Sequence, residues 1–151
     1  MCGIAGFFAR GEWAGAREPA SMLDAMQAAL LHRGPDGQGR WIDASRAAGL
    51  AHVRLAILDT SPAGAQPMRS DDGRFVISFN GEIYNFQALR AELQAEGCTF
   101  RTRSDTEVLL ALLQRHGAAG LPRLRGMYAL ALWDVEARRG LLARDGFGIK
   151  P

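Results

Sequence analysis

The second residue of the chain is a cysteine, within Met1-Cys2-Gly3-Ile4. Removal of Met1 would leave Cys2 at the N-terminus, with a thiol and a free amine in one residue. Because a terminal amine is partly unprotonated near neutral pH, that residue could supply both a nucleophile and the base that accepts its proton. A cysteine at position 2 can also be incidental. The pattern therefore predicts catalysis only in combination with other residues.

A second group of polar residues follows the apolar stretch that ends at Phe79. Asn80, Gly81 and Glu82 place an amide, a glycine and a carboxylate at the expected end of a strand, where sites are often built. An asparagine side chain and a backbone N–H are donors that stabilise an oxyanion formed on a carbonyl. An Asn-Gly pair is equally typical of a plain hairpin turn, and Glu82 could be an exposed strand residue.

Two charged residues could bind opposite ends of a ligand. Arg54 lies between Val53 and the apolar residues 55–58, where a guanidinium is expected to meet an anion, and its planar fork suits a carboxylate. An internal salt bridge would also explain Arg54. Asp105 lies within Ser104-Asp105-Thr106-Glu107, where the start of a helix explains an acidic residue without any ligand.

The composition is that of an ordinary soluble globular domain. The 151 residues are 48% hydrophobic and 23% charged, with 18 basic and 16 acidic residues and a net charge of +2. This length suits one domain with its own core. The charge is small and spread along the chain, so we expect no nucleic-acid partner. No apolar run is long enough to predict a membrane span.

The cysteines and histidines give no sign of a metal site. Cys2, Cys98 and the histidines at positions 32, 52 and 116 share no ligand-like spacing, so no metal is expected. No secretory signal is recognisable, and two cysteines suit free thiols in a reducing compartment. We therefore expect a cytoplasmic location.

The first half of the chain alternates strand and helix patterns. The apolar residues 3–8 predict a buried strand, and apolar residues at helical spacing predict a helix over 21–31 that ends before Gly34-Pro35. Residues 50–58 are rich in β-formers, and 75–79 predict a further strand.

The second half predicts two helices followed by two strands. A helix over 86–96 would have Asn85 as its N-cap, and a second helix opens at Ser104, three residues before Glu107. Residues 127–134 and 141–145 predict strands around a turn. Strands at both ends with helices between them indicate an α+β domain with mainly antiparallel sheets.

Taken together, these segments resemble the N-terminal glutaminase domain of glutamine-hydrolysing asparagine synthetases, a branch of the class II glutamine amidotransferases among the N-terminal nucleophile (Ntn) hydrolases. The sequence Arg54-Leu55-Ala56-Ile57 with Asn80 to Asn85 favours this branch over other class II amidotransferases. The matching stretches follow the family order along the whole chain: residues 1–6, 32–37, 52–57, 66–68, 80–86, 104–108, 126–134 and 143–151.

The resemblance implies a four-layer αββα Ntn-hydrolase fold, with two stacked, mainly antiparallel sheets between helical layers. It implies that residues 1–151 form one glutaminase domain. Relatives continue into an ATP-dependent synthetase domain, recognised by a Ser-Gly-Gly-x-Asp-Ser loop that has no match here. No cofactor is expected in residues 1–151, because ATP and Mg would belong to the synthetase domain.

The resemblance also implies roles for individual residues. Cys2 would attack the side-chain amide of glutamine once Met1 is removed, and Asn80 with the Gly81 N–H would hold the oxyanion. Arg54 would bind the substrate α-carboxylate and Asp105 its α-ammonium. The remaining pocket residues would be Glu82 and the stretch Leu55, Ala56, Ile57 and Leu58.

The function implied is hydrolysis of L-glutamine to glutamate and ammonia through a γ-glutamyl thioester. The ammonia would pass to a C-terminal synthetase domain that makes asparagine or a related amide, and a homodimer is compatible with this arrangement. A non-catalytic glutamine-binding or docking module with the same fold is the alternative. A self-processing hydrolase of another substrate would need a propeptide before the nucleophile, and none precedes Cys2 except Met1.

Overall fold

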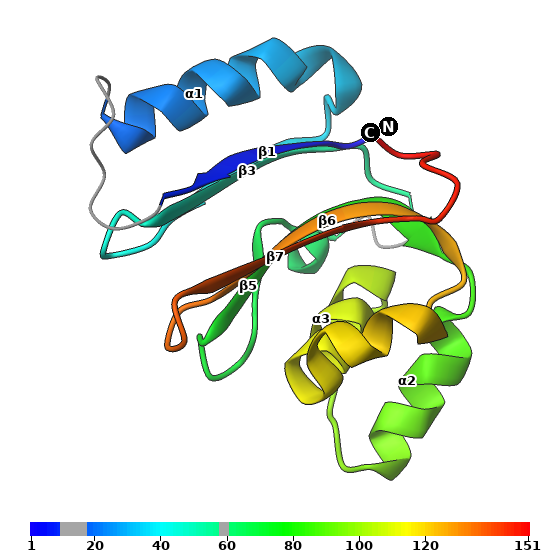
Figure 1. The fold of residues 1–151 in the computed structure, drawn as a ribbon. Helices are drawn as coiled ribbons and strands as arrows, with labels where there is room; N and C mark the ends of the chain where they lie inside the picture. The colour runs from blue at the N-terminus through cyan, green and yellow to red at the C-terminus, as the bar shows by residue number, and fades with distance from the viewer. Residues whose placement is uncertain (10–17, 58–60) are drawn as a thin grey trace.

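The computed structural model describes residues 1–9, 18–57 and 61–151. Two antiparallel sheets are stacked face to face, and helices cover the outer face of each (Figure 1). The four layers form an αββα sandwich, so the fold predicted from the resemblance is confirmed.

The first sheet has three strands in the order β1-β3-β2. Its strands are β1 (Gly3–Phe8), β2 (Gly37–Ile42) and β3 (Ala48–Arg54). Helix α1 (Pro19–Leu30) covers its outer face and continues into the 3-10 turn η1 (Leu31–Arg33) (Figure 1). Leu23 of α1 is fully buried, and the Gln27 side chain donates to the carbonyls of Gly39 and His52, at 2.9 Å each. These contacts fix α1 on the sheet.

The second sheet has four strands in the order β4-β5-β6-β7. Its strands are β4 (Met68–Arg69), β5 (Phe75–Ile83), β6 (Gly126–Asp134) and β7 (Arg139–Arg144). Helices α2 (Phe86–Ala95) and α3 (Asp105–His116) lie on its outer face (Figure 1), and short 3-10 turns η2 (Pro62–Gly64) and η3 (Gly117–Arg123) connect the elements. The large core lies between this sheet and α2 and α3, and it includes Ile77, Phe79, Leu93 and Leu109.

Five details differ from the sequence predictions. The strand expected over 50–58 ends at Arg54, because the next N–H groups bond to side chains and not to a strand. The helix expected over 21–31 begins at Pro19, and β2 and β4 were not predicted. Asn85 stands at the N-cap of α2 but makes no capping bond. Its side chain instead bonds to the backbone of Arg123 and Arg125, at 2.9 Å each.

The fifth difference concerns β5, which continues through Asn80, Gly81 and Glu82 to Ile83. These residues pair with β6, with Asn80 opposite Ala129 and Gly81 opposite Tyr128. The prediction that a strand ends at Phe79 was wrong, and so was the hairpin alternative. Glycine fits within the strand because a Cβ at position 81 would lie 2.3 Å from the carbonyl oxygen of Met127.

His52 lies between the two sheets and predicts a pH dependence of stability. Burial, partly offset by the contact of Nε2 with the Phe79 carbonyl at 3.2 Å, lowers the pKa of His52 from 6.5 to about 4. The unfolded chain therefore binds a proton that the folded chain excludes, and stability is lost as the pH falls from 6.5 toward 4. We expect about 3 kcal/mol to be lost across this range.

Urea titrations across this pH range would measure the effect. In a His52→Gln variant, whose side chain at position 52 cannot be protonated, the free energy of unfolding is expected to depend less steeply on pH. An equally steep dependence in that variant would assign the effect to another group.

Candidate active site

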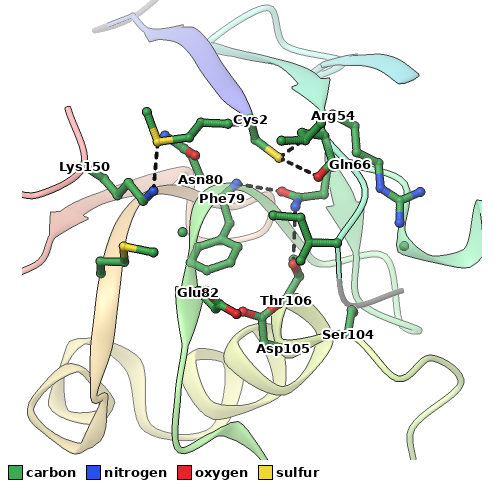
Figure 2. A pocket seen from close by; sticks show the side chains of 16 residues that line it. Cys2, Arg54, Gln66, Phe79, Asn80, Glu82, Ser104, Asp105, Thr106 and Lys150 are labelled. Carbon is green, nitrogen blue, oxygen red and sulfur yellow. Dashed lines mark hydrogen bonds between the residues drawn. The ribbon is translucent and has the colours of Figure 1, made fainter. Parts of the chain in front are cut away.

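A cavity of about 90 Å³ opens where the N-terminus, the end of β3, the edge of β5 and the start of α3 meet (Figure 2). We call it the Cys2 pocket. The described residues that line it are Met1, Cys2, Arg54, Leu55, Ile57, Gly64, Gln66, Phe79, Asn80, Gly81, Glu82, Ser104, Asp105, Thr106, Met127 and Lys150.

Cys2 immediately precedes β1, and its thiol faces the residue that follows β3. The Sγ atom lies 3.3 Å from the Leu55 N–H, which donates to it, and 3.5 Å from the Leu55 carbonyl. The sulfur thus accepts from one backbone group of Leu55 and donates to the other. Met1 is present in this structure, so the nitrogen of Cys2 is part of a peptide bond, and the Met1 amine donates to the Arg33 carbonyl at 3.1 Å.

The edge of β5 that faces the pocket carries N–H groups of every second residue. The Phe79 N–H donates to Oε1 of Gln66 at 2.7 Å, and the Ile83 N–H donates to Oδ2 of Asp105 at 3.0 Å. The alternation of a strand places the Gly81 N–H on this same edge, between the other two. Within the described part of the chain, neither this N–H nor the Asn80 side chain has a recorded hydrogen-bond partner. Two donors are thus available to a ligand.

Arg54 and Asp105 provide charges of opposite sign at the pocket wall. Arg54 is the last residue of β3, is half-buried, and donates from Nη1 to the Ser61 carbonyl at 2.8 Å. Asp105 is the first residue of α3 and only 5% exposed. Burial raises the pKa of Asp105, against the N–H bonds from Ile83 and Thr106, and the neighbouring Glu82 raises it further. A cationic ligand beside Asp105 would favour its ionised form.

The start of helix α3 explains an acidic residue at position 105, but it does not explain the hydrogen bond that Asp105 makes to β5. The N-cap of α3 is Ser104, whose hydroxyl accepts from the Glu107 N–H at 3.2 Å. The carboxylate of Asp105 is therefore not needed as the cap. It reaches across to β5, which fixes it relative to the open Gly81 N–H.

The structure brings eight of the ten predicted site residues to one pocket: Cys2, Arg54, Leu55, Ile57, Asn80, Gly81, Glu82 and Asp105. Ala56 is not among the lining residues, because its N–H is directed to Oδ2 of Asp36 at 2.9 Å. Leu58 lies outside the described residues. The roles of these residues stay predictions.

Gln66 and Lys150 are two of the pocket residues to which the sequence assigned no role. Gln66 accepts from Phe79 and also donates to Oγ1 of Thr106 at 3.3 Å, so it joins β5 to α3 beside the open donors (Figure 2). The stretch Gln66-Pro67-Met68 is part of the family resemblance, and this could have indicated that Gln66 belongs to the site. Lys150 reaches the pocket from the far end of the chain, and no local pattern indicates this.

Within residues 1–9, 18–57 and 61–151, no three side chains of His, Cys, Asp or Glu are grouped as a metal site. None of the helices in the same ranges has the length and apolar character needed to cross a membrane.

A Gly81→Ala substitution should destabilise the protein. Its Cβ would lie 2.7 Å from Cα of Tyr128 and closer still to the Met127 carbonyl, so β6 would have to shift. We expect a loss of about 1 to 3 kcal/mol in the free energy of unfolding, together with reduced activity. Gly146→Ala is the matched control, because nothing lies within 4 Å of a Cβ there. Equal stabilities of the two variants in thermal melts would contradict the prediction.

Comparison with known proteins connects this geometry to a family. The family model described as glutamine amidotransferase domain matches residues 1–151. Asparagine synthetase (glutamine-hydrolyzing) 1 of Bacillus subtilis is 41% identical over 151 residues, covering 100% of this chain and 23% of the relative. Asparagine synthetase B (glutamine-hydrolyzing) of Escherichia coli is 50% identical over 122 residues, covering 81% of this chain and 21% of the relative. The chain thus spans about a quarter of these relatives.

A solved structure shares the fold. Glutamine phosphoribosylpyrophosphate amidotransferase from B. subtilis, in a complex with ADP and GMP, superimposes with a TM-score of 0.76 at 24% identity. The match covers 98% of this chain and 38% of that one. At this identity the likeness establishes the architecture.

Proposed function

The chain belongs to the glutamine amidotransferase domain family, and we propose on this premise that it hydrolyses L-glutamine to glutamate and ammonia with Cys2 as the nucleophile. The observation that carries the proposal is the meeting of Cys2, Asn80, Gly81, Arg54 and Asp105 at one pocket, although they come from four separate segments of the chain.

The two charges would hold the amino-acid end of the substrate. The Arg54 guanidinium suits the α-carboxylate, and Asp105 suits the α-ammonium. Glu82 lies on the same wall and would add negative potential. A zwitterion needs one cation and one anion at a fixed separation, and the bond between Asp105 and β5 supplies that rigidity.

Reaction would begin with attack of the Cys2 thiolate on the side-chain amide carbon. Asn80 and the Gly81 N–H would donate to the oxygen of the tetrahedral intermediate. One such donor typically contributes about 3 to 4 kcal/mol to lowering the barrier. The C–N bond then breaks, and ammonia leaves with a proton carried by the α-amine of Cys2.

Water would complete the cycle. It attacks the γ-glutamyl thioester, its proton passes to the same amine, and the C–S bond breaks to give glutamate and free thiol. The α-amine must therefore be free, which requires removal of Met1. With Met1 in place, we expect glutamine to remain intact.

We propose that the ammonia passes to a C-terminal synthetase domain that uses ATP and Mg to make asparagine or a related amide. The names of the relatives, and the small share of their length that the chain spans, support this proposal. No cofactor is assigned to residues 1–151 themselves. Two free cysteines, one of them the proposed nucleophile, support a reducing, cytoplasmic location.

The test is a glutaminase assay on protein shown by mass spectrometry to lack Met1. We expect glutamate and ammonia in equal amounts, and a covalent adduct on Cys2 with an electrophilic glutamine analogue. Failure of Met1-free protein to form the adduct or release ammonia would refute the proposal. Glutamine binding without ammonia release would instead support the non-catalytic alternative.

A further inference from the structure

Lys150 is a buried cation that the reaction outlined above does not use. It is only 5% exposed and lines the Cys2 pocket. Its one recorded bond within the described ranges runs from Nζ to the thioether Sδ of Met1, at 3.1 Å (Figure 2). A thioether is a weak acceptor, and buried lysines are normally paired with stronger ones.

The segment before Lys150 is built to hold it in place. The carboxylate of Asp145 accepts N–H groups from Phe147, Ile149, Lys150 and Tyr128, at 2.9 to 3.1 Å. Burial opposes ionisation of this carboxyl, but the four bonds outweigh it and lower the pKa of Asp145 to about 2. The backbone at Lys150 is therefore fixed to β6, and its side chain is directed at Met1.

Removal of Met1 would change the surroundings of Lys150. The ammonium would lose its bonding partner. At the same time a new amine would appear on Cys2, at the atom to which Met1 had been joined. Two amines would then share one pocket, separated by the space that the Met1 side chain had filled.

The other charged groups around Cys2 carry both signs. Arg33 donates from Nε to the Cys2 carbonyl at 3.1 Å, and Arg54 lines the pocket from β3, so both add positive charge. The acidic residues that line the pocket are Glu82 and Asp105. Figure 2 shows them together beside the start of α3, at a different side of the pocket from Lys150.

We propose that Lys150 keeps the α-amine of Cys2 unprotonated, and thereby available as the base of the proposed reaction. Two cations that share one pocket repel each other, so the amine that holds its proton less tightly gives it up. A terminal amine gives up a proton more readily than a lysine side chain does. Lys150 thus acts as a positioning residue for a proton, without touching the substrate. This inference rests on the proposed function.

The test compares Lys150→Met, which removes the charge but keeps the length, with Lys150→Arg, which keeps the charge. All proteins are prepared free of Met1, and the Cys2 thiol is reversibly blocked. The pH dependence of N-terminal acetylation by acetic anhydride then reports the protonation of the amine directly. We expect the midpoint pH of N-terminal acetylation to rise by about one pH unit in Lys150→Met and to be unchanged in Lys150→Arg.

Activity provides the second readout. On the acid side of the pH profile, the pH at which kcat/KM for glutamine is half-maximal should rise by the same amount in Lys150→Met. A purely structural role would instead lower activity equally at every pH. Lys150→Gln serves if Lys150→Met does not fold. Unchanged midpoints in the charge-removing variants would overturn the inference. A shifted midpoint in protein that does not hydrolyse glutamine would refute the proposed function and leave the role of Lys150 standing.

Discussion

A Cys2→Ala variant is expected to lose glutamine hydrolysis by a factor of about 10⁴ or more, because no other described residue that lines the Cys2 pocket has a thiol to form the thioester. The variant should still fold, since Cys2 precedes β1 and, within the described residues, the recorded hydrogen bonds of its side chain are those to Leu55. It should also still bind glutamine through Arg54 and Asp105. Ammonia release gives the rate, and calorimetric titration with glutamine gives the binding.

The second cysteine offers a matched control. Cys98 is half-buried against the core between the second sheet and its helices, and it accepts a bond from Arg115 at 3.4 Å. It is not among the described residues that line the Cys2 pocket. A Cys98→Ala variant should keep full activity. Activity that survives in Cys2→Ala but not in Cys98→Ala would move the nucleophile away from the N-terminus.

Asn80→Ala is expected to lower kcat about 10²- to 10³-fold, with little change in KM for glutamine. The amide is available for an oxyanion because no bond of its side chain is recorded within the described residues. Its contribution would be made mainly in the transition state, when negative charge has formed on oxygen.

The structural cost of this change should be small, because the backbone of Asn80 would keep its pairing opposite Ala129. Thermal melts of the variant would check this. A rise in KM at constant kcat would instead assign Asn80 to ground-state binding and remove it from the oxyanion site.

The sequence predicted residues whose chemistry is unusual for their surroundings. Cys2 at the terminus and Arg54 within an apolar segment were recognisable because each conflicts with its local pattern. Asp105 was ambiguous, since the start of α3 alone could explain an acidic residue. Only its bond across to Ile83 of β5 separates it from an ordinary helix start.

The sequence could not predict contacts between distant segments. Gln66 joins Phe79 to Thr106, and Lys150 meets Met1 from the opposite end of the chain. Neither residue differs in type from a surface residue. The Asn80-Gly81 pair was misplaced because local turn preference ignores the approach of β6, which admits only glycine within the strand.

The exposed edge of β5 also sets a length. Its N–H groups recur at roughly 7 Å, so the open donor at Gly81 and the Ile83 N–H that holds Asp105 are one repeat apart. In the proposed complex the substrate would have to span this distance, with its amide oxygen at the Gly81 N–H and its α-ammonium at the Asp105 carboxylate. Asparagine is shorter by one methylene and would leave one end unpaired. The spacing of β5 would thus select glutamine over asparagine, although both carry the same functional groups, by the distance between the amide oxygen and the α-ammonium.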